Sequence, residues 1–174
     1  ETGRALATML RVVFQDEKRY QSSMTRTSLK DVNCSVAQFA EILGDKWSLL
    51  IVRDAFTGVS TFSEFQKRLN VSKNVLTERL NNLVRHGIMD RVQTRPDVER
   101  YTYELTARGK ALFPIGTAIM QWGDKWVFGS EGEPVRVLDK ETGAPVQSIV
   151  VLSRSGNLLE LDDVEYQPGP RAIS

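Results

Sequence analysis

The residues with the strongest intrinsic reactivity in this chain are its single cysteine, Cys34, and its single histidine, His86. A catalytic relay would need the thiol as nucleophile and the imidazole as base, and neither residue stands in a motif that supports such a pair. One cysteine forms no internal disulfide, and one cysteine with one histidine cannot complete a structural zinc site. The sequence therefore predicts a protein that is not an enzyme and that holds no metal and no cofactor.

A group of polar residues lies at the start of a predicted helix that Ser72 can cap. The leucines of this helix form one apolar stripe, so the polar residues off the stripe face away from the core. Asparagine, threonine and lysine near a helix N-terminus can meet base edges or phosphates in the DNA major groove. We therefore predict DNA contacts on this helix from Ser72, Lys73, Asn74, Thr77, Arg79 and Asn81.

Arginines mark a predicted β-hairpin further along the chain. Residues 88–94 and 98–105 have strand-like patterns on either side of the turn Arg95-Pro96-Asp97. Guanidinium groups suit the phosphate backbone and the narrow minor groove. We predict DNA contacts from this hairpin through Arg91, Arg95 and Arg100.

Arg79 and His86 can be interpreted from their positions along the predicted helix that Ser72 caps. Arg79 lies beside the apolar stripe, so the sequence leaves open whether it reaches a phosphate or forms a salt bridge within the domain. His86 stands just before Gly87, where the helix should end and where the helix dipole favours a basic group. We therefore expect a structural role for the histidine.

The elements that must position these residues are short helices with periodic apolar residues. The order of three helices, the second and third joined by a tight turn at Val71, followed by a basic hairpin is that of a winged helix-turn-helix. The helices are predicted from Ser35 to Gly44, from Asp45 as a largely buried helix, from Ser60 or Thr61 to Asn70, and from Ser72 to His86.

A longer helix is predicted after the hairpin, opening at Thr106 and kinked at Pro114. Tryptophans four residues apart on its apolar stripe can line a ligand pocket, but such spacing is more often packing. We predict that the stripe forms the interface of a homodimer, which would make the DNA operator a pseudo-palindrome. Its members are Leu112, Ile115, Ile119, Trp122 and Trp126.

Composition and charge agree with a small globular protein. The chain has 174 residues, of which 41% are hydrophobic and 26% charged, and no stretch approaches the ~20 apolar residues of a membrane span. We expect a soluble, cytoplasmic protein.

The net charge of +1 hides an asymmetry along the chain. Residues 45–110 carry 12 basic and 8 acidic groups, whereas residues 127–174 carry 4 basic and 8 acidic groups. The middle of the chain therefore suits nucleic acid, and the tail does not.

These patterns divide the chain into three parts. Residues 1–23 are expected to be an extension or vector-derived, because the chain opens without methionine and Met24 begins like a natural start. Residues 24–126 should form the winged-helix DNA-binding and dimerisation domain. Residues 127–174 should form an acidic, β-rich extension with strands at 135–138, 146–153 and 158–161, which could cover the core, extend the dimer or present a partner surface. The predicted fold class is α+β.

Several motifs between Cys34 and Arg91 resemble the HxlR family of bacterial transcriptional regulators. They fall in the family's order and include Gly44-Asp45-Lys46-Trp47, Arg53-Asp54, Phe62-Ser63-Glu64, Arg79-Leu80 and Gly87-Ile88, and the resemblance continues to Trp126. It implies a dimeric winged-helix repressor or activator that binds double-stranded DNA and responds to a small-molecule or oxidant effector. The alternative is a winged-helix module for protein or small-ligand interaction whose DNA face is disused.

The resemblance also gives Cys34 a candidate role as a redox sensor, since some members of the family sense electrophiles or oxidants through the corresponding cysteine. A thiol beside a helix N-terminus, with Lys30 nearby, is favoured as thiolate. The alternative is a small, buried and inert residue.

Overall fold

The computed structural model describes residues 28–95 and 97–170, and every structural statement below concerns these residues. The segment 1–23, predicted to be an extension, lies outside them. The chain divides into two compact units, Glu1–Leu49 with Pro168–Ser174 and Leu50–Gln167, which are described separately.

The first unit contains helix α2, Ser35–Leu43, which runs between Cys34 and Gly44 as predicted. Its polar side chains hold the segment that precedes it. The Gln38 amide donates hydrogen bonds to three carbonyl oxygens of that segment, including that of Leu29 at 2.9 Å. The Glu41 carboxylate accepts the Leu29 N–H at 2.8 Å. These bonds fix the approach of the chain to α2.

Helix α3, Lys46–Phe56, begins in the first unit and ends in the second. The Asp45 carboxylate accepts the N–H groups of Trp47 and Ser48 at 3.0 Å each, which confirms the predicted cap. Ser48 and Ile51 are fully buried. The helix is therefore central, as its dense apolar sequence indicates.

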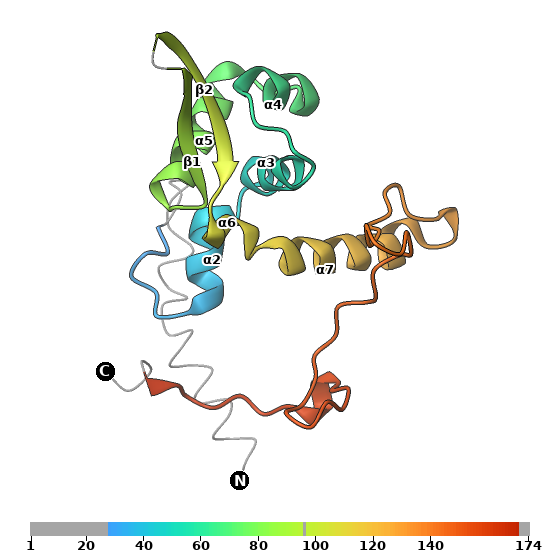
Figure 1. Ribbon diagram of the computed structural model, residues 1–174. Helices are drawn as coiled ribbons and strands as arrows, with labels where there is room; N and C mark the ends of the chain where they lie inside the picture. The colour runs from blue at the N-terminus through green and yellow to red at the C-terminus, as the bar shows by residue number, and fades with distance from the viewer. Residues whose placement is uncertain (1–27, 96, 171–174) are drawn as a thin grey trace. The chain divides into compact units, whose positions relative to one another are not determined.

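Helices α4, Phe62–Leu69, and α5, Lys73–Arg85, form the helix-turn-helix of the second unit (Figure 1). Between them Asn70 takes a left-handed conformation, with φ of 47°, which asparagine tolerates better than most residues. Ser72 caps α5 by accepting the Val75 N–H at 3.4 Å. The apolar faces of α3, α4 and α5 are buried at Ile51, Phe65, Leu76, Leu80 and Leu83.

The predicted hairpin is present as strands β1, Met89–Arg95, and β2, Val98–Leu105, paired antiparallel. Gly87, with φ of 66°, makes the turn from α5 into β1. A further bridge joins Thr61 to Thr102, so the residues before α4 run beside β2 as a very short third strand. This bridge, which the sequence did not predict, brings the start of α4 to the wing.

The long helix predicted after the hairpin is present as α7, Phe113–Gly123, which runs on into a π-helical turn η2, Asp124–Phe128. Its predicted start at Thr106 forms a separate short helix, α6, Ala107–Lys110, so the expected kink at Pro114 is a break between two helices. Thr106 caps α6 as expected, accepting the Gly109 N–H at 3.0 Å. Pro114 sits in the first turn of α7, where its missing N–H costs nothing. Its ring is incompatible with a helical carbonyl four residues earlier, so the helix breaks before it.

Helix α7 packs on the end of α3. The rings of Phe113 and Phe56 meet edge to face, with centroids 5.6 Å apart. A Cβ at Gly116 would lie 3.2 Å from the Phe56 ring, so the absence of a side chain permits this close approach.

The tail after η2 has turns but no continuous strands within the described residues. The strands predicted at 135–138, 146–153 and 158–161 are reduced to single bridges, Leu138 with Pro145 and Leu152 with Leu158. An isolated two-stranded hairpin is marginal in water, and proline donates no ladder hydrogen bond. The apolar residues of the tail therefore remain open to solvent in the single chain.

Candidate nucleic-acid interface

The N-terminal face of α5 presents an exposed polar surface on a buried apolar support. Leu76, Leu80 and Leu83 have no exposed surface, which holds the helix firmly in the domain. Five of the six residues predicted to contact DNA from this helix are exposed: Ser72, Lys73, Asn74, Thr77 and Asn81.

Arg79, the sixth, is placed differently. Its side chain is only 16% exposed, and one guanidinium nitrogen lies 3.4 Å from the Glu78 carboxylate. The arginine therefore lies mostly within the domain surface. This geometry matches the salt-bridge alternative that the sequence left open.

The wing carries three exposed arginines with different neighbours. The Arg91 guanidinium lies over the Tyr101 ring, 3.7 Å from its centroid, so the aromatic face holds the cation in a fixed direction. Arg95 is 3.7 Å from the Asp97 carboxylate, in a pair whose side chains are both more than two-thirds exposed. Such a surface pair contributes little stability, so Arg95 can exchange its partner at low cost.

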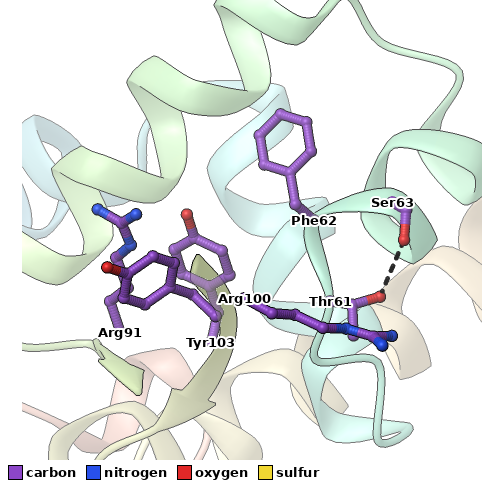
Figure 2. Close-up of a pocket in the computed structure, with 7 residues that line it drawn as sticks. Thr61, Phe62, Ser63, Arg91, Arg100 and Tyr103 are labelled. Carbon is purple, nitrogen blue, oxygen red and sulfur yellow. Dashed lines mark hydrogen bonds between the residues drawn. The ribbon is translucent and has the colours of Figure 1, made fainter. Parts of the chain in front are cut away.

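A cleft of about 350 Å³ lies between the wing and the start of α4. Figure 2 shows Arg91 and Tyr103 on one side of it and Arg100 extending toward the side of Thr61 and Ser63. The sequence did not identify this cleft, because its walls are brought together by the pairing of residues 60–61 with β2, about 40 residues further along the chain. The lining comprises Thr61, Phe62, Ser63, Arg91, Arg100, Tyr101 and Tyr103.

The α4 side of the cleft is held by a capping box. The Thr61 hydroxyl donates to the Glu64 carboxylate at 2.6 Å, the Thr61 N–H donates to the same oxygen at 3.1 Å, and the Glu64 N–H donates to the hydroxyl at 3.3 Å. These hydrogen bonds from Thr61 lower the pKa of Glu64, and the positive charge of Arg100 adds to the effect. The carboxylate therefore stays ionised and locked to the helix start.

A buried carboxylate on α3 links this helix to α4. Asp54 is 1% exposed and accepts two hydrogen bonds from the Arg53 guanidinium, at 2.8 and 3.0 Å. Its second oxygen lies 3.8 Å from Arg68 Nε on α4, and Arg68 also donates to the Thr57 hydroxyl at 3.3 Å. The cluster thus ties the first helix of the helix-turn-helix to the helix beneath it.

The single cysteine and the single histidine are both helix-capping residues and are not among the residues predicted to contact DNA. Cys34 is half-buried at the N-cap of α2, and its thiol makes no capping hydrogen bond. His86 is the C-cap of α5, and its carbonyl oxygen accepts a hydrogen bond from Arg108 at 2.9 Å. Within the described residues no three cysteine, histidine or carboxylate side chains gather as metal ligands.

The predicted dimer stripe on α7 is exposed over most of its length. Trp122 and Trp126 are 62% and 65% exposed, and Ile115 and Ile119 are about half exposed, whereas Leu112 is partly covered. This stripe is therefore apolar surface that the single chain leaves uncovered.

In the described part of the chain, helices long and apolar enough to cross a bilayer are absent.

A three-helix core, a helix presenting polar residues at its N-terminal end and an arginine-bearing hairpin define a winged helix-turn-helix protein. A sequence model of the HxlR-like helix-turn-helix family matches residues 42–131. The chain belongs to this family.

Relatives and solved structures agree with this placement. The chain is 35% identical over 136 residues to Mb3122, an HTH-type transcriptional regulator of Mycobacterium bovis, covering 78% of this chain and 86% of the relative. It is 39% identical over 88 residues to YvaP, another HTH-type transcriptional regulator, from Bacillus subtilis, covering 50% and 82%. The crystal structure of PA1607, a candidate transcription factor, is 41% identical and matches 82% of this chain and all of its own with a TM-score of 0.77. The redox regulator HypR in its reduced form is 26% identical and matches 56% and 99%, with a TM-score of 0.50.

Proposed function

We propose that this protein is a transcriptional regulator that binds double-stranded DNA sequence-specifically as a homodimer. The observation that carries the proposal is the exposed polar face at the start of α5, set on three fully buried leucines and flanked by an arginine-bearing wing. Membership of the HxlR-like family and the description of its relatives as transcriptional regulators support the same function.

In this proposal the start of α5 enters the major groove. Asn74 and Thr77 reach base edges, because both are exposed within the first two turns and asparagine can pair with two groups of an adenine. Lys73 and Ser72 contact phosphates at the groove edge. Asn81, one turn further along, lies closer to the backbone.

The wing and the cleft take phosphates of the adjacent backbone. Arg91 and Arg100 flank the cleft from its two sides, and both have guanidinium groups that suit phosphate oxygens. Arg95 at the tip exchanges its weak pair with Asp97 for the backbone or the minor groove. These contacts position the protein without specifying sequence.

The homodimer forms through the exposed stripe of α7. Two-fold symmetry then sets two α5 helices about 34 Å apart, one turn of DNA, and makes the operator a pseudo-palindrome. The exposure of Ile119, Trp122 and Trp126 supports this interface, since isolated chains rarely leave such a stripe open.

The regulator responds to oxidants or electrophiles through Cys34. A half-exposed thiol at the start of α2 and the similarity to the redox regulator HypR support this part of the proposal. It is tested by measuring DNA affinity before and after diamide or quinone treatment, with Cys34→Ser in parallel. A change that the serine variant lacks is expected, and equal affinities in all four samples would refute it.

The DNA proposal is tested by fluorescence anisotropy on the intergenic duplex beside the protein's own gene, against a scrambled duplex, at two salt concentrations. We expect nanomolar affinity for the native duplex and a steep loss as salt rises. Weak binding that is indifferent to sequence and salt would contradict the proposal and favour a protein- or ligand-interaction module.

A further inference from the structure

Exposed large apolar residues concentrate in the part of the chain that begins with α7. Outside this region, Val36 and Val92 are the large apolar side chains that lie exposed in the described residues. The others extend from α7 through the tail. Those of the tail are Val135, Leu138, Ile149, Val150, Val151, Leu152, Leu158, Leu161, Val164 and Tyr166.

The tail is attached to the same helix that carries the exposed stripe. The Gln121 amide nitrogen donates to the Gln147 carbonyl at 3.0 Å, and its amide oxygen accepts the Ile149 N–H at 2.8 Å. Both polar ends of one side chain are thus used to hold the tail backbone. The apolar run that begins at Ile149 is therefore tethered at its start to α7, the helix that carries the exposed stripe.

The turns of the tail are closed by backbone hydrogen bonds within the tail, but its apolar side chains are not covered. One turn is closed by the Asp139 N–H donating to the Ala144 carbonyl at 2.9 Å, and another by the Ser153 N–H donating to the Asn157 carbonyl at 2.8 Å. Beside these turns Val151 remains 63% exposed. The turns therefore present the apolar run without covering it.

The exposed apolar side chains of α7, η2 and the tail together offer a large area. From the exposed fractions, those between Ile115 and Tyr166 sum to on the order of 1,500 Å². Each partner in a stable complex buries about 800 Å². These side chains therefore offer enough apolar area for a stable interface between two chains.

Part of the tail is matched by a solved structure. The match to PA1607 covers 82% of this chain, which exceeds the fraction contained in residues 1–131, so it extends beyond the end of the family match and into the tail. The two proteins therefore have at least part of the tail in common.

We infer that residues 133–167 pack against the second copy of this chain, so that each subunit's tail covers apolar surface of its partner and extends the α7 interface. The inference rests on the proposed homodimer and specifies which segment completes it. A second copy fits because Gln121 holds the tail on α7, the helix that carries the proposed dimer stripe, and two-fold symmetry buries one self-complementary surface twice.

A charge placed in the apolar run tests the inference in the full chain. Val151→Asp should weaken the dimer at least about tenfold, because an unpaired carboxylate would have to be buried. Val92→Asp is the matched control, since Val92 is also exposed, at 41%, but lies on the wing. Sedimentation equilibrium of both variants and of the unchanged protein gives the dimer dissociation constants. Equal constants for all three would overturn the inference.

A second measurement decides whether the tail contacts its own subunit or the partner. Dimers are formed from equal amounts of ¹³C-labelled and unlabelled chains, and filtered NOEs between them are recorded. We expect intermolecular NOEs from the methyl groups of Val150, Val151 and Leu152. A stable dimer without them would overturn the tail inference and leave the homodimer standing, whereas a monomeric full chain at micromolar concentration would overturn both. DNA binding is measured separately by anisotropy.

Discussion

The backbone N–H of Tyr103 donates a hydrogen bond to the carbonyl oxygen of Ser60 at 2.7 Å. This bond, with the bridge between Thr61 and Thr102, fastens the second strand of the wing to the residue that caps α4. The wing is therefore attached to the helix-turn-helix at its base, while its tip with Arg95 extends free of the core. The bond thereby sets the position of the wing arginines relative to the start of α4.

Replacement of Lys73 should weaken DNA binding without changing sequence preference. Lys73 is exposed at the first position of α5, where a phosphate contact is proposed. Lys73→Ala should lower the slope of log affinity against log salt by about 0.9, the value for one phosphate on duplex DNA. The control is Arg85→Ala, an exposed basic residue at the other end of the helix. A salt series by anisotropy gives both slopes, and an unchanged slope for Lys73→Ala would contradict the phosphate contact.

Replacement of Asn74 should change preference rather than general affinity. Asn74 is exposed near the start of α5, and its amide can donate and accept at one base edge. Asn74→Ala should cost about 1–3 kcal/mol on the native operator and almost nothing on a duplex mutated at the contacted base pair. A panel of single-base operator variants measures this difference. An equal loss on every duplex would argue for a backbone contact instead.

Arg79→Ala should act mainly on stability. The side chain is 16% exposed and its guanidinium is next to Glu78, so its packing and polar contacts lie within the domain. We expect a loss of about 1 kcal/mol in the free energy of unfolding and an unchanged salt slope for DNA binding. Urea denaturation and the anisotropy series measure the two quantities. A lowered slope with unchanged stability would show that the arginine reaches a phosphate.

Thr61→Ala should destabilise the protein in a pH-dependent way. The threonine caps α4, and loss of such a cap costs about 1 kcal/mol near neutral pH. Its hydrogen bonds hold the pKa of Glu64 below the ordinary value, so the folded state binds that proton more weakly than the unfolded state. The stabilisation that comes with Glu64 ionisation is therefore present above the unfolded pKa of about 4.3 and is lost as the pH falls through the lower folded pKa.

The gap in unfolding free energy between the unchanged protein and Thr61→Ala should therefore narrow from about pH 6 to about pH 3. Urea denaturation followed by circular dichroism measures it. Ser63→Ala serves as control, because Ser63 is 3.3 Å from the Thr61 hydroxyl but outside the capping box. A gap that is constant with pH would contradict the coupling between Thr61 and Glu64.

The two arginines around Asp54 should differ in their effect on stability. Arg53 makes hydrogen bonds of 2.8 and 3.0 Å to the buried carboxylate, whereas Arg68 Nε is 3.8 Å away. Arg53→Ala leaves the carboxylate with only the distant partner and should cost about 1–3 kcal/mol. Arg68→Ala should cost under about 1 kcal/mol. Chemical denaturation of both single variants measures the order, and the reverse order would contradict this assignment.

The local elements of the fold could be predicted from the sequence because their signals are local. Thr61, Ser72 and Thr106 cap helices in the structure as predicted, since a hydroxyl three residues before a free N–H is a short-range interaction. The hairpin likewise follows from alternation around a turn. The exposure of five of the six polar residues predicted on α5 follows from the helical period alone.

Only the tertiary structure decided the features that depend on residues distant in the chain. It placed Arg79 largely inside the domain, buried Asp54 between two arginines, and formed the cleft by pairing residues 60–61 with β2. It also left the tail without the strands that its β-like sequence indicated. A strand needs a partner and a covering layer, and neither is encoded within the segment itself, whereas a helix and its cap satisfy their hydrogen bonds from within.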